Sequence, residues 1–293
     1  MDVARSVKQP GPPAARRVQA VEGRCSSLEV MLEPGLSLLE AVRRPLAAFG
    51  CSSAAVELKG GALGPFSYFL PAYSETPEHA AFYSQPFSRD GVSALKVARG
   101  TFGIRDGSPL LHCHAIWSQH GTARGGHLLT TEAIVAEPIK ARIWSLDGVG
   151  FEAHPDAETN FTLFGPVVLP PTLPSSDRPL RSKRCFALRL MPNQDICTAL
   201  EDFCRSEGIS AAVVRGGVAS IIGAIFEDGS SVTSEVTEML ICTGTIAFRS
   251  HGATHATLDV ELVDHKGKVA AGRLVRGANP ILITAEIVLE VLA

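Results

Sequence analysis

The sequence lacks several of the signatures by which a function is most often recognised. Its seven cysteines contain no C-x-x-C pair, which excludes a cysteine-based zinc ribbon and a thioredoxin-like redox site. It also contains no phosphate-binding loop, dinucleotide fingerprint or Ser-His-Asp order. No apolar run approaches the roughly 20 residues that a membrane-spanning helix needs. An odd number of cysteines without close pairing favours reduced thiols, and hence a cytoplasmic protein.

Charge is also scarce. Only 19% of the 293 residues are charged, and the formal net charge is −3, so no global attraction to nucleic acid or to an anionic membrane is expected. Hydrophobic residues make up 45% of the chain, as in a soluble globular protein. The length allows one large domain or two medium ones.

What the chain does contain is a histidine-rich stretch from Leu110 to Leu129, LLHCHAIWSQHGTARGGHLL. Alternate side chains of a β-strand point to opposite faces, so His112 and His114 share a face. If the chain reverses within 118–122, His127 lies on the next strand and reaches the same patch. Three imidazoles with no fourth protein ligand in the motif describe an open, catalytic-type zinc site. The alternative is that they are ordinary strand residues.

Four other residues near this stretch have two interpretations each. Cys113 faces away from the histidines and is expected in the core. Glu132 is a candidate general base or a partner that orients a ligand histidine, although a solvent-facing strand position is favoured. Arg99 and Arg142 lie on predicted strands and either bind an anionic substrate or form surface ion pairs.

Regular elements are expected from Leu28 onward. The first 27 residues contain three prolines and several arginines but no apolar core stretch, which predicts a flexible arm over 1–27. An apolar residue at every third or fourth position predicts a helix over 34–49. Strands are predicted at 28–32, 54–58, 66–70, 93–99, 110–118 and 133–144.

The region after residue 185 repeats this layout. A second helix pattern covers 195–204, and SAAVVRGGV from Ser210 mirrors SAAVELKGGA from Ser53. When Gly267 is matched with Gly121, equal distances along the chain give the residue that stands at each histidine position of the second copy. These are Leu258 for His112, Val260 for His114 and Arg273 for His127. We therefore predict one functional copy and one structural copy. The boundaries would be a first domain at 28–164, a proline-rich linker at 165–184 and a second domain at 185–293.

The order of these features resembles that of the PPC (plants and prokaryotes conserved) family. The resemblance rests on a helix, a strand ending in Gly60-Gly61-Ala62-Leu63, and the H-x-H…G-G-H-L run at His112, His114 and 125–128. It covers both predicted domains. It implies an α/β (α+β) fold of two similar domains, each a largely antiparallel β-sheet flanked by helices, and usually a homotrimer. For His112, His114 and His127 it implies a bound divalent metal, zinc by the family's precedent.

Plant members of the family carry AT-hooks, but no Arg-Gly-Arg-Pro core occurs in this sequence. Neither an AT-hook nor a positive face therefore supports nucleic-acid binding. Three hypotheses stand at this level. The first is a metal-binding protein that binds or acts on a small molecule at an open three-histidine site. The second is a DNA-associated regulator, and the third is an oligomeric binding scaffold without catalysis.

Overall fold

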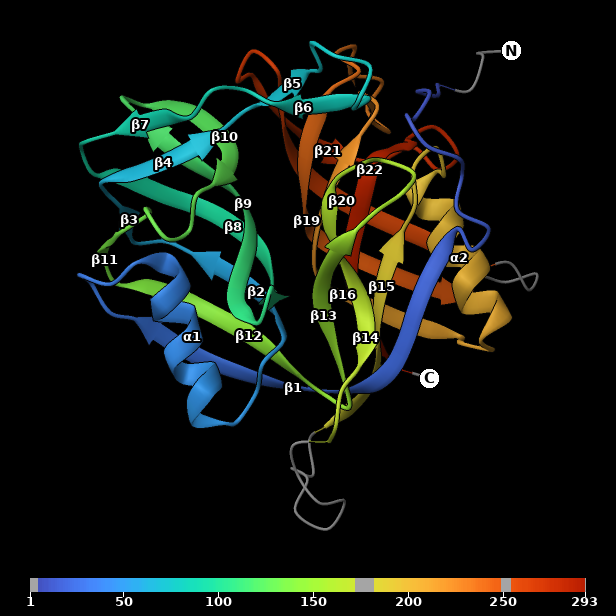
Figure 1. Cartoon of the computed structure of the whole chain (residues 1–293), viewed down its shortest axis with the longest axis horizontal. Coiled ribbons are helices and arrows are strands. Elements are labelled where there is room, and N and C mark those ends of the chain that lie inside the picture. The colour runs from blue at the N-terminus through green and yellow to red at the C-terminus, as the bar shows by residue number, and fades with distance from the viewer. Residues whose placement is uncertain (1–4, 172–181, 249–253, 293) are drawn as a thin grey trace.

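Two lobes of antiparallel sheet, each with one helix, lie side by side (Figure 1). This computed structural model describes residues 5–171, 182–248 and 254–292. The long strands and the helix of the first lobe are β1 (Val18–Leu32), α1 (Leu38–Ala48), β2 (Ala54–Lys59), β8 (Ser93–Arg105), β9 (Ser108–Gln119), β10 (Thr122–Leu128) and β12 (Ile139–Asp147). Their counterparts in the second lobe are β15 (Lys183–Leu190), α2 (Ile196–Ser206), β16 (Ala211–Ile221), β19 (Thr237–Phe248), β20 (Thr254–Asp264), β21 (Val269–Arg273) and β22 (Ile281–Val291).

Shorter strands complete the lobes. In the first lobe they are β3 (Ala62–Leu63), β4 (Phe66–Phe69), β5 (Pro71–Tyr73), β6 (Ala81–Tyr83), β7 (Phe87–Arg89) and β11 (Val135–Glu137). The second lobe adds β17 (Ala224–Ile225) and β18 (Ser231–Val232). A hairpin of β13 (Val149–Pro155) and β14 (Thr162–Val168) lies between the lobes (Figure 1).

The two main sheets have the same strand order. The first is β1–β12–β2–β8–β9–β10, and the second is β15–β22–β16–β19–β20–β21, with every pair antiparallel. The internal repeat expected from the sequence is therefore seen in the topology. The predicted α/β (α+β) class with largely antiparallel sheets is confirmed, although sheet dominates and each lobe has one helix of 11 residues.

Both helices begin at a side-chain cap and bury one apolar face. The hydroxyl of Ser37 accepts a hydrogen bond from the Glu40 backbone N–H, and the Asp195 carboxylate accepts one from the Thr198 backbone N–H. Such caps satisfy backbone donors that have no partner within the helix. Because Ser37 is the cap, α1 begins four residues later than the predicted start at residue 34. Its buried residues are Leu38, Ala41, Val42 and Leu46.

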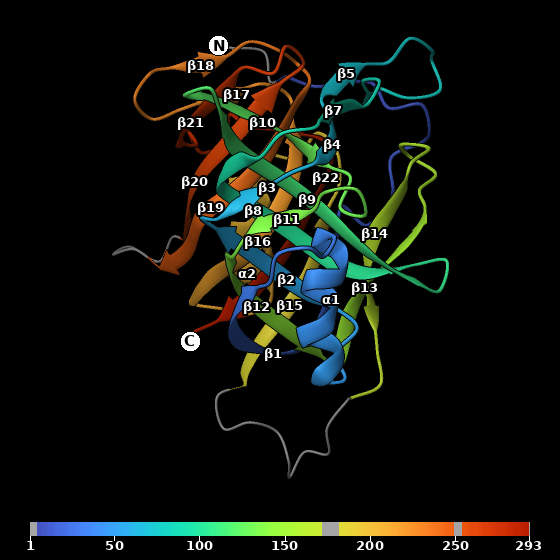
Figure 2. The ribbon, with the colours of Figure 1, turned by 90° about the vertical axis from the view of Figure 1, so that its left-hand side faces the viewer.

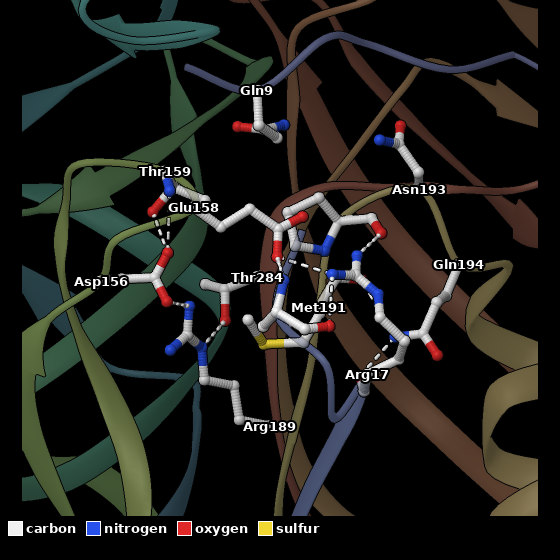
Figure 3. Close-up of polar contacts among 12 residues, drawn as sticks. Gln9, Arg17, Asp156, Glu158, Thr159, Arg189, Met191, Asn193, Gln194 and Thr284 are labelled. Atoms are coloured by element: carbon white, nitrogen blue, oxygen red, sulfur yellow. Dashed lines mark hydrogen bonds and ion pairs between the residues drawn. The ribbon is translucent and has the colours of Figure 1, made fainter. Parts of the chain in front are cut away.

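The prediction of a flexible arm over 1–27 is wrong for the described residues. Strand β1 starts at Val18, because its first half pairs with β15, a partner far away in sequence. Before it, the Arg17 guanidinium contacts the buried Glu158 carboxylate at 2.6 Å and donates to the Pro192 carbonyl. The side chain of Gln9 is buried and donates to the Leu282 carbonyl. Figure 3 shows these residues together, with the polar network that ties this segment to the second lobe.

The predicted linker is also shorter than expected. Residues 165–168 belong to β14 and residues 183–184 to β15, whereas 172–181 lie outside the described residues. Strand β1 pairs with β12 through its second half and with β15 through its first half, so it joins both sheets. A division into two domains at 28–164 and 185–293 therefore stays a proposal, in which β1 is shared.

The lobes pack through the sheet faces that their helices leave uncovered. Helix α1 covers the outer face of the first sheet, as Figure 2 shows, and packs with Cys113 and Ala115 of β9. On the opposite face Arg99, 1% exposed, donates to the carbonyls of Ile241 and Cys242 in β19, at 2.9 and 2.8 Å. Gly216 of β16 permits close approach, since a Cβ there would lie 2.9 Å from the Cβ of Ala55. Neither helix in the described part of the chain has the length and apolar character needed to cross a bilayer.

Candidate metal centre between the lobes

The three predicted histidines lie together on the inner face of the first sheet. His112 and His114 come from β9, and the chain reverses through a tight turn at His120 and Gly121, both with positive φ. Strand β10 returns so that His127 pairs directly with His114. Residues opposite each other in an antiparallel pair share a face. One ligand atom from each of the three side chains therefore lies within 4.8 Å of the others.

Two of the imidazoles use their Nδ1 atoms as hydrogen-bond donors. His114 Nδ1 lies 2.9 Å from the Met239 carbonyl oxygen, which can only accept, so it carries the hydrogen. His112 Nδ1 lies 2.9 Å from Oε2 of Glu286, whose carboxylate accepts in the same way. In the neutral rings both Nε2 atoms then carry lone pairs, and they face each other at 3.1 Å. Two facing lone pairs repel unless a metal ion or a proton lies between them, and a metal ion takes the place of that proton.

A carboxylate from the second lobe completes the cluster. Oε1 of Glu238 lies 3.7 Å from His114 Nε2 and 3.6 Å from His127 Nδ1, too far for good hydrogen bonds. Oε2 of Glu238 and Nδ1 of His127 are both buried without a hydrogen-bond partner, which costs free energy in a metal-free protein. Ligand atoms bound at ~2.0–2.2 Å around a tetrahedral ion are separated by about 3.3 Å. The donor set therefore fits a divalent ion.

Burial and neighbouring charges have opposite effects on the pKa values of the cluster. It lowers the pKa of His114 to about 3, against the opposing charge of Glu238. Burial also acts to lower the pKa of His112, but the charge and hydrogen bond of Glu286 outweigh it, and that pKa is raised. For Glu238 burial acts to raise the pKa, yet the histidines around it lower it on balance. At neutral pH the cluster thus offers a neutral His114 and an ionised Glu238, both in the form that binds metal.

The sequence interpretation missed the contribution of the second lobe. Glu238, Met239 and Glu286 belong to β19 and β22, and no motif joins them to the histidines. The one available signal is a buried charge in an apolar strand, since Glu286 interrupts the run ILITAEIVL and is 1% exposed. Charged residues are almost never fully buried without a partner. The histidine cluster is thus lined by residues of both copies of the repeat.

Comparison with known proteins finds a family match for the second copy of the repeat. Residues 178–293 match the model of the Plants and Prokaryotes Conserved (PCC) domain. The C-terminal part of the chain is similar to this domain. The first lobe has the strand order of the C-terminal lobe, so the chain carries the same topology twice. The family resemblance inferred from the sequence is thereby confirmed, with the match on the copy that lacks the histidines.

Solved structures similar to the chain each correspond to about half of it. A PPC protein from Pyrococcus horikoshii has 19% identity and a TM-score of 0.41, over 51% of this chain and 97% of its own. A metal-containing protein from Archaeoglobus fulgidus has 19% identity and a TM-score of 0.39, over 47% and 92%. A proposed DNA-binding protein from Ralstonia eutropha has 16% identity and a TM-score of 0.38, over 47% and 89%. No curated protein sequence matches the chain.

The residues that replace the histidines in the PCC domain differ from those predicted by counting. The first hairpin turns through two residues after Gln119, whereas the second turns through three between Asp264 and Lys268. A one-residue shift moves every strand side chain to the other face. Leu258 and Val260 are therefore core residues. The register places Asp259 at the position equivalent to His114 and Thr257, two residues earlier, at the position equivalent to His112. Arg273 does take the place of His127, where it forms a 2.8 Å ion pair with Asp259.

The other candidates of the sequence are accounted for elsewhere in the fold. Cys113 lies in the core, where burial raises the pKa of its thiol to about 12. Arg99 holds the lobes together, and Arg142 forms an ion pair with Glu29 at the surface. Arg99 pairs with His114 across β8 and β9, but its guanidinium is directed to the carbonyls of β19. Glu132 is exposed, as favoured, but lies in a turn rather than a strand.

Two cavities adjoin the cluster. One of about 310 Å³ is lined by His112, His127 and Glu286, together with Arg105 and apolar residues of β9, β10, β13 and β14. A smaller one of about 50 Å³ is lined by His112, His114 and Glu238 and by the rings of Phe82, Tyr83 and Phe161. Small-molecule sites are concave and mostly apolar with a few convergent polar groups, and the larger cavity has this character.

Proposed function

We propose that this chain binds one divalent metal ion, zinc, between its two lobes and presents it to a small molecule. His112, His114 and His127 hold the ion, and Glu238 of the second lobe faces it as a compensating charge, so the fourth position is left to water or to the small molecule. The observation that carries this proposal is the 3.1 Å approach of two imidazole Nε2 atoms whose Nδ1 atoms are both engaged. Imidazole and carboxylate donors together are typical of zinc sites.

The residues around the ligands give the centre its geometry. The Met239 carbonyl and the Glu286 carboxylate fix the tautomers and ring orientations of His114 and His112, as outer partners of metal-bound histidines commonly do. The burial of Glu238 and Glu286 keeps water away from both carboxylates. Their two negative charges balance those of a divalent ion. When bound, such an ion polarises an oxygen of a ligand as a Lewis acid.

Metal analysis of the purified full chain tests the proposal. We expect about one equivalent of zinc per chain by elemental analysis, and tight binding of added zinc by the metal-free protein in a chelator competition. Protein that contains no divalent metal and does not bind added zinc at micromolar concentration would contradict the proposal.

The affinity for zinc should depend on pH through one histidine. The pKa of His112 is raised and that of His114 is lowered to about 3, so His112 carries the proton that a metal must displace near neutral pH. Affinity should therefore increase about tenfold per pH unit below the pKa of His112 and level off above it. A zinc competition series between about pH 5.5 and 8.5, corrected for the chelator, measures this slope. A slope of two protons would show that a second group of the site is also protonated there.

The assembly and the alternative functions rest on resemblance alone. We propose a homotrimer, which would hold three metal centres and six sheet lobes. Light scattering should then give three times the 31.0 kDa of one chain, and a strict monomer at micromolar concentration would contradict it. A DNA-associated role is suggested by the name of the Ralstonia eutropha protein, whereas the net charge of −3 favours a small-molecule ligand.

A further inference from the structure

Arg105 lies on the same sheet face as the histidine cluster. It ends β8 and pairs with Ser108 of β9, while His112 pairs with Thr101 of β8. Residues 101, 103 and 105 alternate onto one face of a regular strand, so Arg105 points to the side of His112. Four residues of strand separate the two positions, which is about 13 Å. This separation is long enough for a small molecule to lie between the guanidinium of Arg105 and the imidazole of His112.

The cavity between them has one cationic wall and an apolar interior. Its polar lining residues are Arg105, Glu286, His112, His127, Tyr83, Thr130, Thr131 and Thr162. Glu286 is already bonded to His112, and the Thr130 hydroxyl donates to the Leu111 carbonyl. The other half of the lining is apolar: Phe69, Leu110, Leu111, Leu128, Leu129, Ala153, Leu163 and Phe164. Its volume of about 310 Å³ is at the lower end of the roughly 300–1,000 Å³ of small-molecule sites.

The guanidinium of Arg105 is available to a ligand. Its ion pair with Asp106 is 3.7 Å long, and the two side chains are 51% and 88% exposed. An exposed pair of that length contributes little to stability. The carboxylate that lines the same cavity, Glu286, is already engaged with His112. The N–H groups of the Arg105 guanidinium therefore remain able to bind a ligand in the cavity.

We propose that this cavity binds a small carboxylic acid with an apolar, aromatic-sized body. The planar fork of Arg105 binds the carboxylate, and the body extends between the phenylalanine and leucine side chains toward His112 and His127. A carboxylate fits better than a phosphate because one guanidinium compensates one negative charge. The proposal deepens the proposed function, since the acid would be the small molecule that reaches the metal centre.

Binding of a matched acid and amide tests the proposal on the full, zinc-loaded chain. The probes are 3-phenylpropanoate and its uncharged amide, measured by isothermal titration. We expect the acid to bind about tenfold more tightly than the amide, because a charge-assisted fork is stronger than a neutral hydrogen bond. Arg105→Gln should remove this preference, whereas Arg105→Lys should restore part of it. The control Arg205→Gln, on the exposed side of α2, should leave it unchanged.

The outcomes separate this proposal from that of the metal centre. Equal affinities for acid and amide in the wild-type chain, or a preference that survives Arg105→Gln, would overturn the carboxylate site. Tight binding of inorganic phosphate that depends on Arg105, without binding of the acid, would overturn it as well. An Arg105-dependent preference in a chain that binds no zinc would retain this site and refute the metal centre. Zinc content should be the same in Arg105→Gln and wild type.

Discussion

Replacing His114 with alanine is expected to abolish tight zinc binding and to leave both lobes folded. His114 supplies one of the two Nε2 atoms that face each other at 3.1 Å, and its own Nδ1 is held by Met239 of the second lobe. Loss of one imidazole leaves the ion with two histidine ligands, His112 and His127. The second lobe folds with Asp259 at the matching position, so the fold does not need a histidine there and the cost in folding should be small.

The measurement is zinc stoichiometry by elemental analysis together with thermal unfolding with and without added zinc. Wild-type protein should gain stability from zinc, because a ligand that binds the native state alone shifts the unfolding equilibrium. His114→Ala should show no gain. The control is His154→Ala, an exposed histidine of β13, which should bind zinc as wild type does. A full equivalent of tightly bound zinc in His114→Ala would refute the assignment.

Replacing Glu238 with glutamine should weaken zinc binding by about a hundredfold or more, although Glu238 lies in the copy that has no histidines. Its carboxylate lies 3.6–3.7 Å from two histidine nitrogens and has a buried oxygen without a partner. Loss of that charge leaves a divalent ion in a buried site with poorer compensation. In the metal-free protein the same substitution should raise the free energy of unfolding, because a buried carboxylate with an unpartnered oxygen is replaced by a neutral amide.

Zinc affinity by chelator competition and the unfolding free energy of the metal-free protein measure the two effects. Glu235→Gln is the matched control, since Glu235 lies three residues earlier in the chain and is exposed. If Glu238→Gln bound zinc with wild-type affinity, the ion would be held by the first lobe alone. The second PCC copy would then be a structural repeat, as the sequence had led us to expect.

The parts of the fold that could be predicted are those whose signal is local. The apolar spacing of α1 and the cap at Asp195 lie within a few residues of the helices they define. The turn at His120 and Gly121 lies between two strands that are adjacent in sequence, so the pairing of His114 with His127 follows from the alternation of one hairpin. The one-residue error in the second copy came from a turn of unequal length.

The remaining features depend on partners far away in the chain. The first half of β1 has little apolar pattern and becomes a strand only because β15 pairs with it. Arg99 was a candidate for anion binding, yet the carbonyls that it binds lie in the second lobe. The residue pattern of a single segment cannot predict these contacts, because they depend on how the two sheets pack against each other.

By itself, the sequence determined that the chain is a repeated sheet unit and that one copy holds three histidines on one face. Strand alternation and hairpin closure are local geometry, and they act wherever the strand is placed. Only the tertiary structure decided that this face turns inward, against Glu238 and Glu286 of the other copy. The physical reason is that a buried carboxylate is stable only beside a partner, and the packing of the two lobes brings the partners together.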